Sequence, residues 1–203
     1  MMPVLYSMAF RLAQAQRNAL AEGNCLVLYE GYRPYTVQRQ VADALTALIR
    51  QDPEVRAAVT DPPWSISWFI NTSYSNHQWG YAVDISLARL NTVRESTTGG
   101  FRYIRAEDYN LYEMPTAIHE LSRAAATFTE PVASHSVTAW RSAVPAPGMN
   151  EEGFALQRYC SGAGLTPLAS EWWHFNDLDA RTQVLDNLSA GSYIISSVRS
   201  TAP

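Results

Sequence analysis

The order of helix-like and strand-like segments is the feature that most limits the folds open to this chain. Residues 4–22 have helical spacing of apolar side chains, and residues 25–30, "CLVLYE", form a short β-rich run. We expect a second helix over 36–50, with Thr36 as its N-cap, and a buried strand over 81–87, "YAVDISL". These segments mix without regular β–α–β alternation. The order therefore predicts an α+β fold, with a central antiparallel sheet flanked by helices.

The second half of the chain carries weaker signals. Residues 91–110 are polar and contain glycine, which predicts a long loop. Residues 115–128 and 150–160 predict two helices, the first with a proline in its first turn. Two runs, "EWWHF" (171–175) and "SYIISSV" (192–198), have strand-like composition. Because we find neither a repeat nor a long linker, we expect residues 1–203 to form a single domain.

Composition excludes some classes of partner. The net charge is −4 and the basic residues are scattered, which argues against nucleic acid. No apolar run is long enough to predict a membrane span. The start of the chain lacks the pattern of a signal peptide, so the default is the cytoplasm. The cell envelope or secretion becomes the expectation if the N-terminus is truncated, and the compartment stays open.

Cysteine usage also leaves alternatives. Cys25 and Cys160 are too few for a zinc-finger framework. Two buried thiols and one disulfide are both consistent with the sequence, and the oligomeric state is open.

Two short stretches contain the residues that suit catalysis. The first, "SNHQWGYAVDIS", holds His77 and Asp84, with Gly80 allowing a turn between them. The second, "SEWWHF", holds Glu171 and His174. A catalytic zinc site uses about three protein ligands and keeps an open position for water. Two imidazoles and one carboxylate would supply those ligands, and the remaining carboxylate would be the base that such a water requires.

The spacing of the second pair sets a geometric condition. Residues three apart share one face of a helix but point to opposite faces of a strand. "EWWHF" is strand-like, so the chain must bend or bulge between Glu171 and His174 if both serve one metal. Asp84 is short and lies on a rigid strand, which suits a ligand. Glu171 is longer, which suits the base.

The two stretches together resemble a known family. The pattern Ser75-x-His77-x-x-Gly80-x-Ala82-x-Asp84, followed by Glu171-x-Trp173-His174, is similar to that of the zinc D-Ala-D-Ala dipeptidases and D,D-carboxypeptidases. That family includes the vancomycin-resistance dipeptidase. The resemblance extends to "YEGYRPY" and to the helix before it, and so covers most of the chain. It implies a fold like that of the hedgehog and D,D-peptidase domains.

The resemblance also implies a role for each matching residue. One Zn²⁺ per chain would be bound by His77, Asp84 and His174. Glu171 would be the general base and acid, Arg33 would stabilise the transition state, and Ser75 would help to hold the substrate. The implied reaction is hydrolysis of the D-Ala-D-Ala dipeptide in bacterial cell-wall metabolism.

One position departs from the dipeptidase pattern. His119, in "YEMPTAIHEL", aligns with an aspartate that binds the free ammonium of the dipeptide in that family. A mostly neutral imidazole cannot replace a fixed negative charge, although His119 remains a candidate for substrate binding. Release of the terminal D-Ala from longer peptidoglycan peptides, by a D,D-carboxypeptidase, therefore stays open. A catalytically inactive zinc-containing binding module is the third alternative, and Glu171 argues against it because such a module needs no base.

Overall fold

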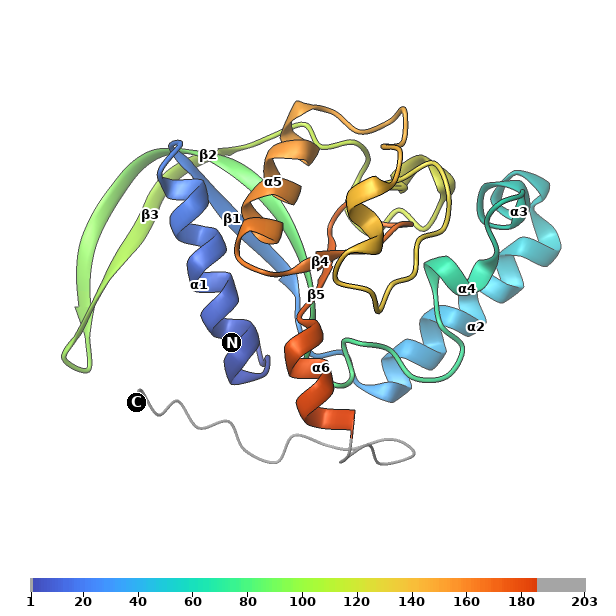
Figure 1. The fold of residues 1–203 in the computed structure, drawn as a ribbon, viewed down its shortest axis with the longest axis horizontal. Coiled ribbons are helices and arrows are strands. Elements are labelled where there is room, and N and C mark those ends of the chain that lie inside the picture. The colour runs from blue at the N-terminus through green and yellow to red at the C-terminus, as the bar shows by residue number, and fades with distance from the viewer. Residues whose placement is uncertain (1, 186–203) are drawn as a thin grey trace.

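One long strand, β2, organises the fold (Figure 1). The computed structural model describes residues 2–185. Its strands are β1 (Asn24–Glu30), β2 (Ala82–Thr98), β3 (Phe101–Leu111), β4 (Thr166–Pro167) and β5 (His174–Asn176). Its helices are α1 (Tyr6–Leu20), α2 (Tyr35–Gln51), α3 (Pro53–Thr60), α4 (Ile66–Phe69), α5 (Glu151–Gly162) and α6 (Leu178–Leu185), with two short 3₁₀ turns, η1 (Arg123–Ala125) and η2 (Ala139–Ser142).

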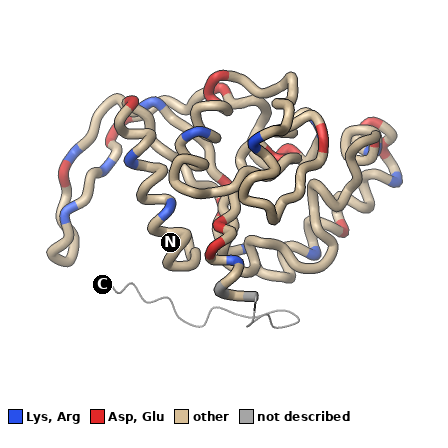
Figure 2. Tube along the Cα trace, in the orientation of Figure 1, with Lys and Arg blue, Asp and Glu red and all other residues tan. Residues whose placement is uncertain are grey.

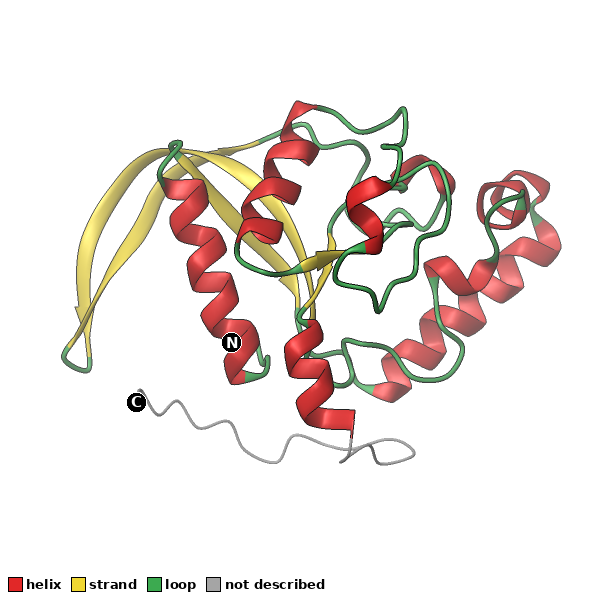
Figure 3. Cartoon of the chain, viewed as in Figure 1, coloured by secondary structure: helices red, strands yellow, loops and turns green. Residues whose placement is uncertain are grey.

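All strand pairs in the described sheet are antiparallel. β1 pairs with the first half of β2 along one edge. Along the other edge, β5 pairs with the start of β2, and β3 pairs with its remainder. β4 extends the sheet beyond β5. Figure 3 shows α1 and α5 lying across the sheet, with α2 to α4 grouped away from the β2–β3 hairpin. The expected α+β fold, a central antiparallel sheet flanked by helices, is confirmed.

Alternation along β2 separates the core from the site. Val83, Ile85 and Leu87 are buried and belong to one apolar cluster, together with residues of the two covering helices, among them Met8, Leu12, Leu156 and Tyr159. Since successive side chains of a strand point to opposite faces, Asp84 and Ser86 face away from that cluster. Burial of the apolar face thus fixes the face on which Asp84 is presented.

Two expectations about helices are wrong in detail. Helix α2 begins at Tyr35 after Pro34, without a side-chain cap, so Thr36 is not its N-cap. Residues 115–128 contain only the 3₁₀ turn η1, because their backbone groups bond elsewhere. The N–H groups of Thr127 and Phe128 donate to Ala169 O at 2.9 and 3.2 Å, which holds this segment in extended form.

The expectations about strands also need correction. Residues 91–110 are not a loop: they belong to β2 and β3, which form a long hairpin. In "EWWHF" the strand starts only at His174, and the residues before it form a turn. The expected strand at 192–198 lies outside the described residues.

Some remaining properties follow directly from the structure. Among residues 2–185, no helix combines the length and the apolar character needed to cross a bilayer. Cys25 and Cys160 are free, buried thiols, so the disulfide alternative is not realised. Figure 2 shows the arginines spread along the whole trace rather than gathered on one element.

Candidate metal centre and active site

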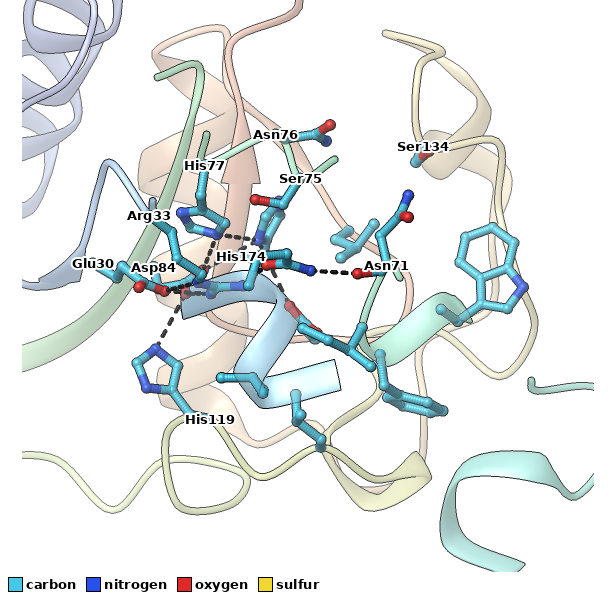
Figure 4. A pocket seen from close by; sticks show the side chains of 18 of the residues that line it. Glu30, Arg33, Asn71, Ser75, Asn76, His77, Asp84, His119, Ser134 and His174 are labelled. Atoms are coloured by element: carbon cyan, nitrogen blue, oxygen red, sulfur yellow. Dashed lines mark hydrogen bonds and ion pairs between the residues drawn. The ribbon is translucent and has the colours of Figure 1, made fainter. Parts of the chain in front are cut away.

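Three buried side chains converge on one point, as Figure 4 shows from close by. His77 Nε2 lies 3.1 Å from His174 Nδ1, and His174 Nδ1 lies 3.1 Å from Asp84 Oδ1. The third side of the triangle, from His77 Nε2 to Asp84 Oδ1, is 3.3 Å. A tetrahedral zinc ion with ligand distances of about 2.0–2.1 Å separates its ligand atoms by about 3.3–3.4 Å. The triangle therefore has nearly the dimensions of three corners of a zinc site.

The sheet register explains why two of these residues meet. Asp84 of β2 lies directly opposite His174 of β5 on one side and opposite Glu30 of β1 on the other. Residues directly opposite in an antiparallel pair point to the same face, a few ångströms apart. Three charged or ionisable side chains from three strands are thereby brought into one row.

Outer hydrogen bonds orient both imidazoles. His77 Nδ1 lies 2.8 Å from Gly31 O, and His174 Nε2 lies 3.1 Å from Asn176 Oδ1. Since both partners are acceptors, these two outward nitrogens carry protons, and in the neutral form of each ring the inward nitrogen is left unprotonated. Each inward nitrogen then presents a lone pair, and Asp84 adds a carboxylate oxygen. Three acceptors facing one another at such distances suit a cation, and outer hydrogen bonds of this kind are usual at metal sites.

The turn before β5 meets the condition set by the sequence. His174 N donates to Glu171 O at 3.2 Å, so residues 171–174 form a tight turn. Trp172 and Trp173 within it are almost fully buried and anchor it in the core. As a result Glu171 and His174 lie on the same side, with Glu171 Oε2 3.6 Å from His174 Nδ1. Glu171 thus lies next to the ligand triangle without being part of it.

The environments of the two carboxyl groups move their pKa values in opposite directions. Burial, with Asp84 as a neighbouring negative charge, raises the pKa of Glu171 to about 7. Burial also disfavours the charged form of Asp84, but His77, His119 and His174 outweigh it and hold the pKa of Asp84 well below its usual range. Two neighbouring carboxyl groups with pKa values shifted in opposite directions are typical of a site in which one carboxylate stays charged and the other carries a proton.

Arg33 supplies positive charge beside the triangle. Its Nε donates to Glu30 Oε2 at 2.9 Å, and its Nη1 donates to Gln38 Oε1 at 2.7 Å. Its Nη2 contacts Glu30 and lies 3.6 Å from Asp84 Oδ2. Glu30, Asp84 and Glu171 keep the guanidinium charged despite its burial, and raise its pKa. The guanidinium group, with its fork of N–H donors, is thus held rigidly at the edge of the site.

Comparison with known proteins now decides the family. A family model described as D-ala-D-ala dipeptidase matches residues 4–190. The chain belongs to the D-Ala-D-Ala dipeptidase family. No curated protein matches the chain. Among solved structures, a zinc complex of a mutant of the vancomycin-resistance D,D-pentapeptidase VanY, from a VanB-type cassette, is similar at 16% identity. That similarity covers 90% of this chain and 78% of the other, with a TM-score of 0.35.

In this D-Ala-D-Ala dipeptidase family member, the site opens into a pocket of about 520 Å³. Arg33, Ser75 and Glu171 all line it, as do the three triangle residues. Ser75 is buried, and its Oγ accepts from Gln78 N at 3.3 Å. The structure therefore brings the residues singled out from the sequence into one pocket.

His119 enters the same pocket in an unusual conformation. Its φ is 63°, in the left-handed region that residues other than glycine rarely adopt. Its Nε2 donates to Asp84 Oδ2 at 3.1 Å, and its ring meets Trp173 edge to face. The hydrogen bond to Asp84 raises the pKa of His119. His119 thus contacts the carboxylate of the triangle on the side opposite the two histidines.

Other residues of the site were missed by sequence reasoning. Glu30 and Gln38 hold Arg33, and Asn176 orients His174. Glu30 carried a weak signal, because it immediately precedes the "GYRPY" turn. Gln38 and Asn176 carried none, because only the tertiary structure brings them to their partners.

Proposed function

We propose that this protein is a zinc-dependent peptidase that hydrolyses the D-Ala-D-Ala dipeptide in bacterial cell-wall metabolism. The observation that carries the proposal is the triangle of His77, Asp84 and His174 with the buried carboxyl of Glu171 beside it. Membership of the D-Ala-D-Ala dipeptidase family supports the choice of substrate. We propose that residues 1–203 act as one peptidase domain.

The proposed ligands of a single Zn²⁺ are Nε2 of His77, Oδ1 of Asp84 and Nδ1 of His174. When bound, zinc supplies Lewis acidity, which polarises a carbonyl group and makes water a stronger acid. Gly31 O and Asn176 Oδ1 keep the two imidazoles in the tautomers that present these nitrogens.

Glu171 carries the proton in this proposal. Its carboxylate takes a proton from the attacking water, and the same carboxyl then protonates the leaving amine. In the metal-free site burial raises the pKa of Glu171 to about 7, towards the ambient pH, and this direction favours a group that must accept and then donate a proton. Its buried position keeps bulk water from competing for that proton.

Arg33 and Ser75 serve the substrate. The guanidinium, already fixed by Glu30 and Gln38, would stabilise negative charge that develops on the substrate carbonyl oxygen. Ser75 would help to hold the peptide at the pocket wall.

His119 favours a second candidate function, a D,D-carboxypeptidase that releases the terminal D-Ala of longer peptides. The imidazole contacts Asp84, Arg33 binds Glu30, and Glu171 is the proposed base. Among these residues, the pocket therefore has no unpaired carboxylate that could bind the free ammonium group of a dipeptide. A pocket of about 520 Å³ is also of the size that encloses drug-sized ligands.

One set of assays separates these functions. Purified protein is analysed for metal, and its activity is measured on free D-Ala-D-Ala and on an N-acylated peptide ending in D-Ala-D-Ala, before and after chelation. We expect one zinc per chain and zinc-dependent release of D-alanine from the dipeptide. Cleavage of the acylated peptide alone would establish the carboxypeptidase. Stoichiometric zinc without hydrolysis of either substrate would favour the inactive binding module, and full activity after complete removal of zinc would refute the mechanism.

A further inference from the structure

The distal half of the β2–β3 hairpin stands apart from the rest of the fold (Figure 1). We call residues 90–98 of β2 together with β3 the ribbon. All 11 residues of β3 are exposed, although β3 is a regular strand paired to β2. β1 pairs with β2 only as far as Arg89. Beyond Leu90, whose N–H donates to Gly23 O, the ribbon therefore has two strands and two free edges among the described strands.

A two-stranded ribbon of this kind would be stabilised by pairing with a further strand. A two-stranded hairpin alone is marginally stable in water, and a free edge presents unpaired N–H and C=O groups. The ribbon also exposes apolar side chains: Phe101, Tyr103, Tyr109 and Leu111 of β3 are 63, 45, 49 and 57% exposed. All four have odd numbers and so lie on one face of β3. Both the backbone edge and the side chains are suited to strand addition.

Symmetry restricts how β3 can pair with β3 of a second copy. Two identical antiparallel strands are related by a two-fold axis perpendicular to the sheet, so each face of one strand continues into the same face of the other. Opposite residues must then have numbers of equal parity. The register that overlaps the full strand has its axis at Ala106, the midpoint of Phe101–Leu111.

The side chains are self-complementary in that register. Its opposite pairs on the apolar face are Phe101 with Leu111, Tyr103 with Tyr109, and Arg105 with Glu107. Each pair occurs twice by symmetry. Moving the axis to residue 105 or to residue 107 would instead place two arginines or two glutamates directly opposite each other, which is unfavourable.

The charges within one chain support the same partner. Arg94 lies directly opposite Arg105 in the β2–β3 register, a like-charged pair. Glu107 bridges Arg94 at 2.6 Å, while the ion pairs of the described residues include none for Arg105. Glu107 of a second copy would supply the missing counter-charge. The β2–β3 register is the same on both sides of a local irregularity near Thr92, so the face assignment holds along the strand.

We propose that the protein forms a two-fold dimer in which the β3 strands of two copies pair antiparallel about Ala106. The two ribbons then make a continuous four-stranded sheet, with an aromatic pair and an Arg–Glu pair on each side of the axis.

Two charge reversals in the full-length protein test this arrangement. Arg105→Glu places a carboxylate opposite Glu107 of the second copy, but within the chain it converts the Arg94–Arg105 contact into an attractive pair. Glu107→Arg places a second guanidinium opposite Arg105 of the second copy. We expect each variant to raise the dimer dissociation constant by about tenfold or more, measured by sedimentation velocity over a concentration series. Thermal unfolding of Arg105→Glu should show an intact monomer.

Mixing the two variants gives the decisive measurement. In the heterodimer one contact has its two charges exchanged, and the other joins the unchanged Glu107 of one chain to the unchanged Arg105 of the other, so both contacts are attractive. A 1:1 mixture should therefore dimerise although each variant alone is weak. Arg102→Glu is the matched control: it makes the same charge change in the same strand, but faces the neutral Asn110, and should leave dimerisation within a few-fold. A wild-type chain that stays monomeric up to ~200 µM would overturn the proposal. So would a dimer that both reversals leave unchanged, because its interface would lie elsewhere.

Discussion

Replacement of Glu171 by glutamine tests the proposed mechanism most directly. The amide has nearly the shape of the carboxyl group but cannot accept the proton of the attacking water. Glu171 lies outside the ligand triangle, with Oε2 3.6 Å from His174 Nδ1, so the metal ligands are unchanged. General acid–base catalysis contributes about 10²- to 10⁴-fold, which is roughly 3–5 kcal/mol of activation free energy. We expect kcat to fall by that factor and KM to change little, since the lost interaction acts in the transition state.

The structure also predicts the effect of this substitution on the stability of the metal-free protein. The pKa of Glu171 is raised from 4.5 to about 7 by burial, so the native state holds this proton more tightly than the unfolded chain. The contribution of Glu171 to the free energy of unfolding is therefore fully present below pH 4.5 and is lost as the pH rises through about 7. The full difference is about 3 kcal/mol, at about 1.4 kcal/mol per factor of ten. Metal-free Glu171→Gln should escape this loss and unfold at a higher temperature than metal-free wild type at about pH 8.

The assay pairs metal analysis with kinetics on whichever substrate the wild type cleaves. Glu171→Asp is the control, because it keeps a carboxylate and should retain more activity than the glutamine variant. Glu171→Gln that carries stoichiometric zinc and keeps more than about a tenth of the wild-type kcat would refute the role of Glu171 as the base.

Three further substitutions test other parts of the structure. His119→Ala removes the donor to Asp84 Oδ2 and should weaken zinc binding by about 10- to 100-fold in competition with a chromogenic chelator, while His119→Gln, which can still donate, should weaken it less. Arg33→Lys keeps the charge but loses the fork held by Glu30, and should lower kcat/KM by about 100-fold or more without changing the circular dichroism spectrum. Glu22, whose pKa is lowered to about 2 by its hydrogen bond from Arg158, contributes stability that is present above pH 4.5 and lost as the pH falls towards 2. Glu22→Gln should therefore flatten the pH dependence of the melting temperature in that range, and an unchanged slope would contradict the assignment.

The parts of the fold that contribute apolar side chains to the core were predictable from sequence. α1, α2, β1 and the first half of β2 carry apolar residues at regular spacing, and all four are present at about the expected positions. The ribbon was missed because both of its faces are exposed, so its strands lack the alternation that identifies a half-buried strand. The helix expected at 115–128 fails for another reason. Its local propensity is overridden by backbone bonds to Ala169, a contact that no local pattern reveals.

The proposed site residues were visible in the sequence, but their convergence depends on pairing between distant strands. Asp84 and His174 are 90 positions apart, and a shift of β5 by one residue would turn His174 towards the apolar cluster of α1 and α5. The tight turn at 171–174 prevents such a shift. Trp172 N donates to Ala125 O at 3.0 Å, Trp173 O accepts from Ile85 N at 2.9 Å, and both indoles are buried. The tryptophans between Glu171 and His174 therefore do more than line the pocket and pack in the core. They fix the register on which the ligand triangle depends, so truncating Trp173 should cost metal binding even though its side chain is not one of the proposed ligands.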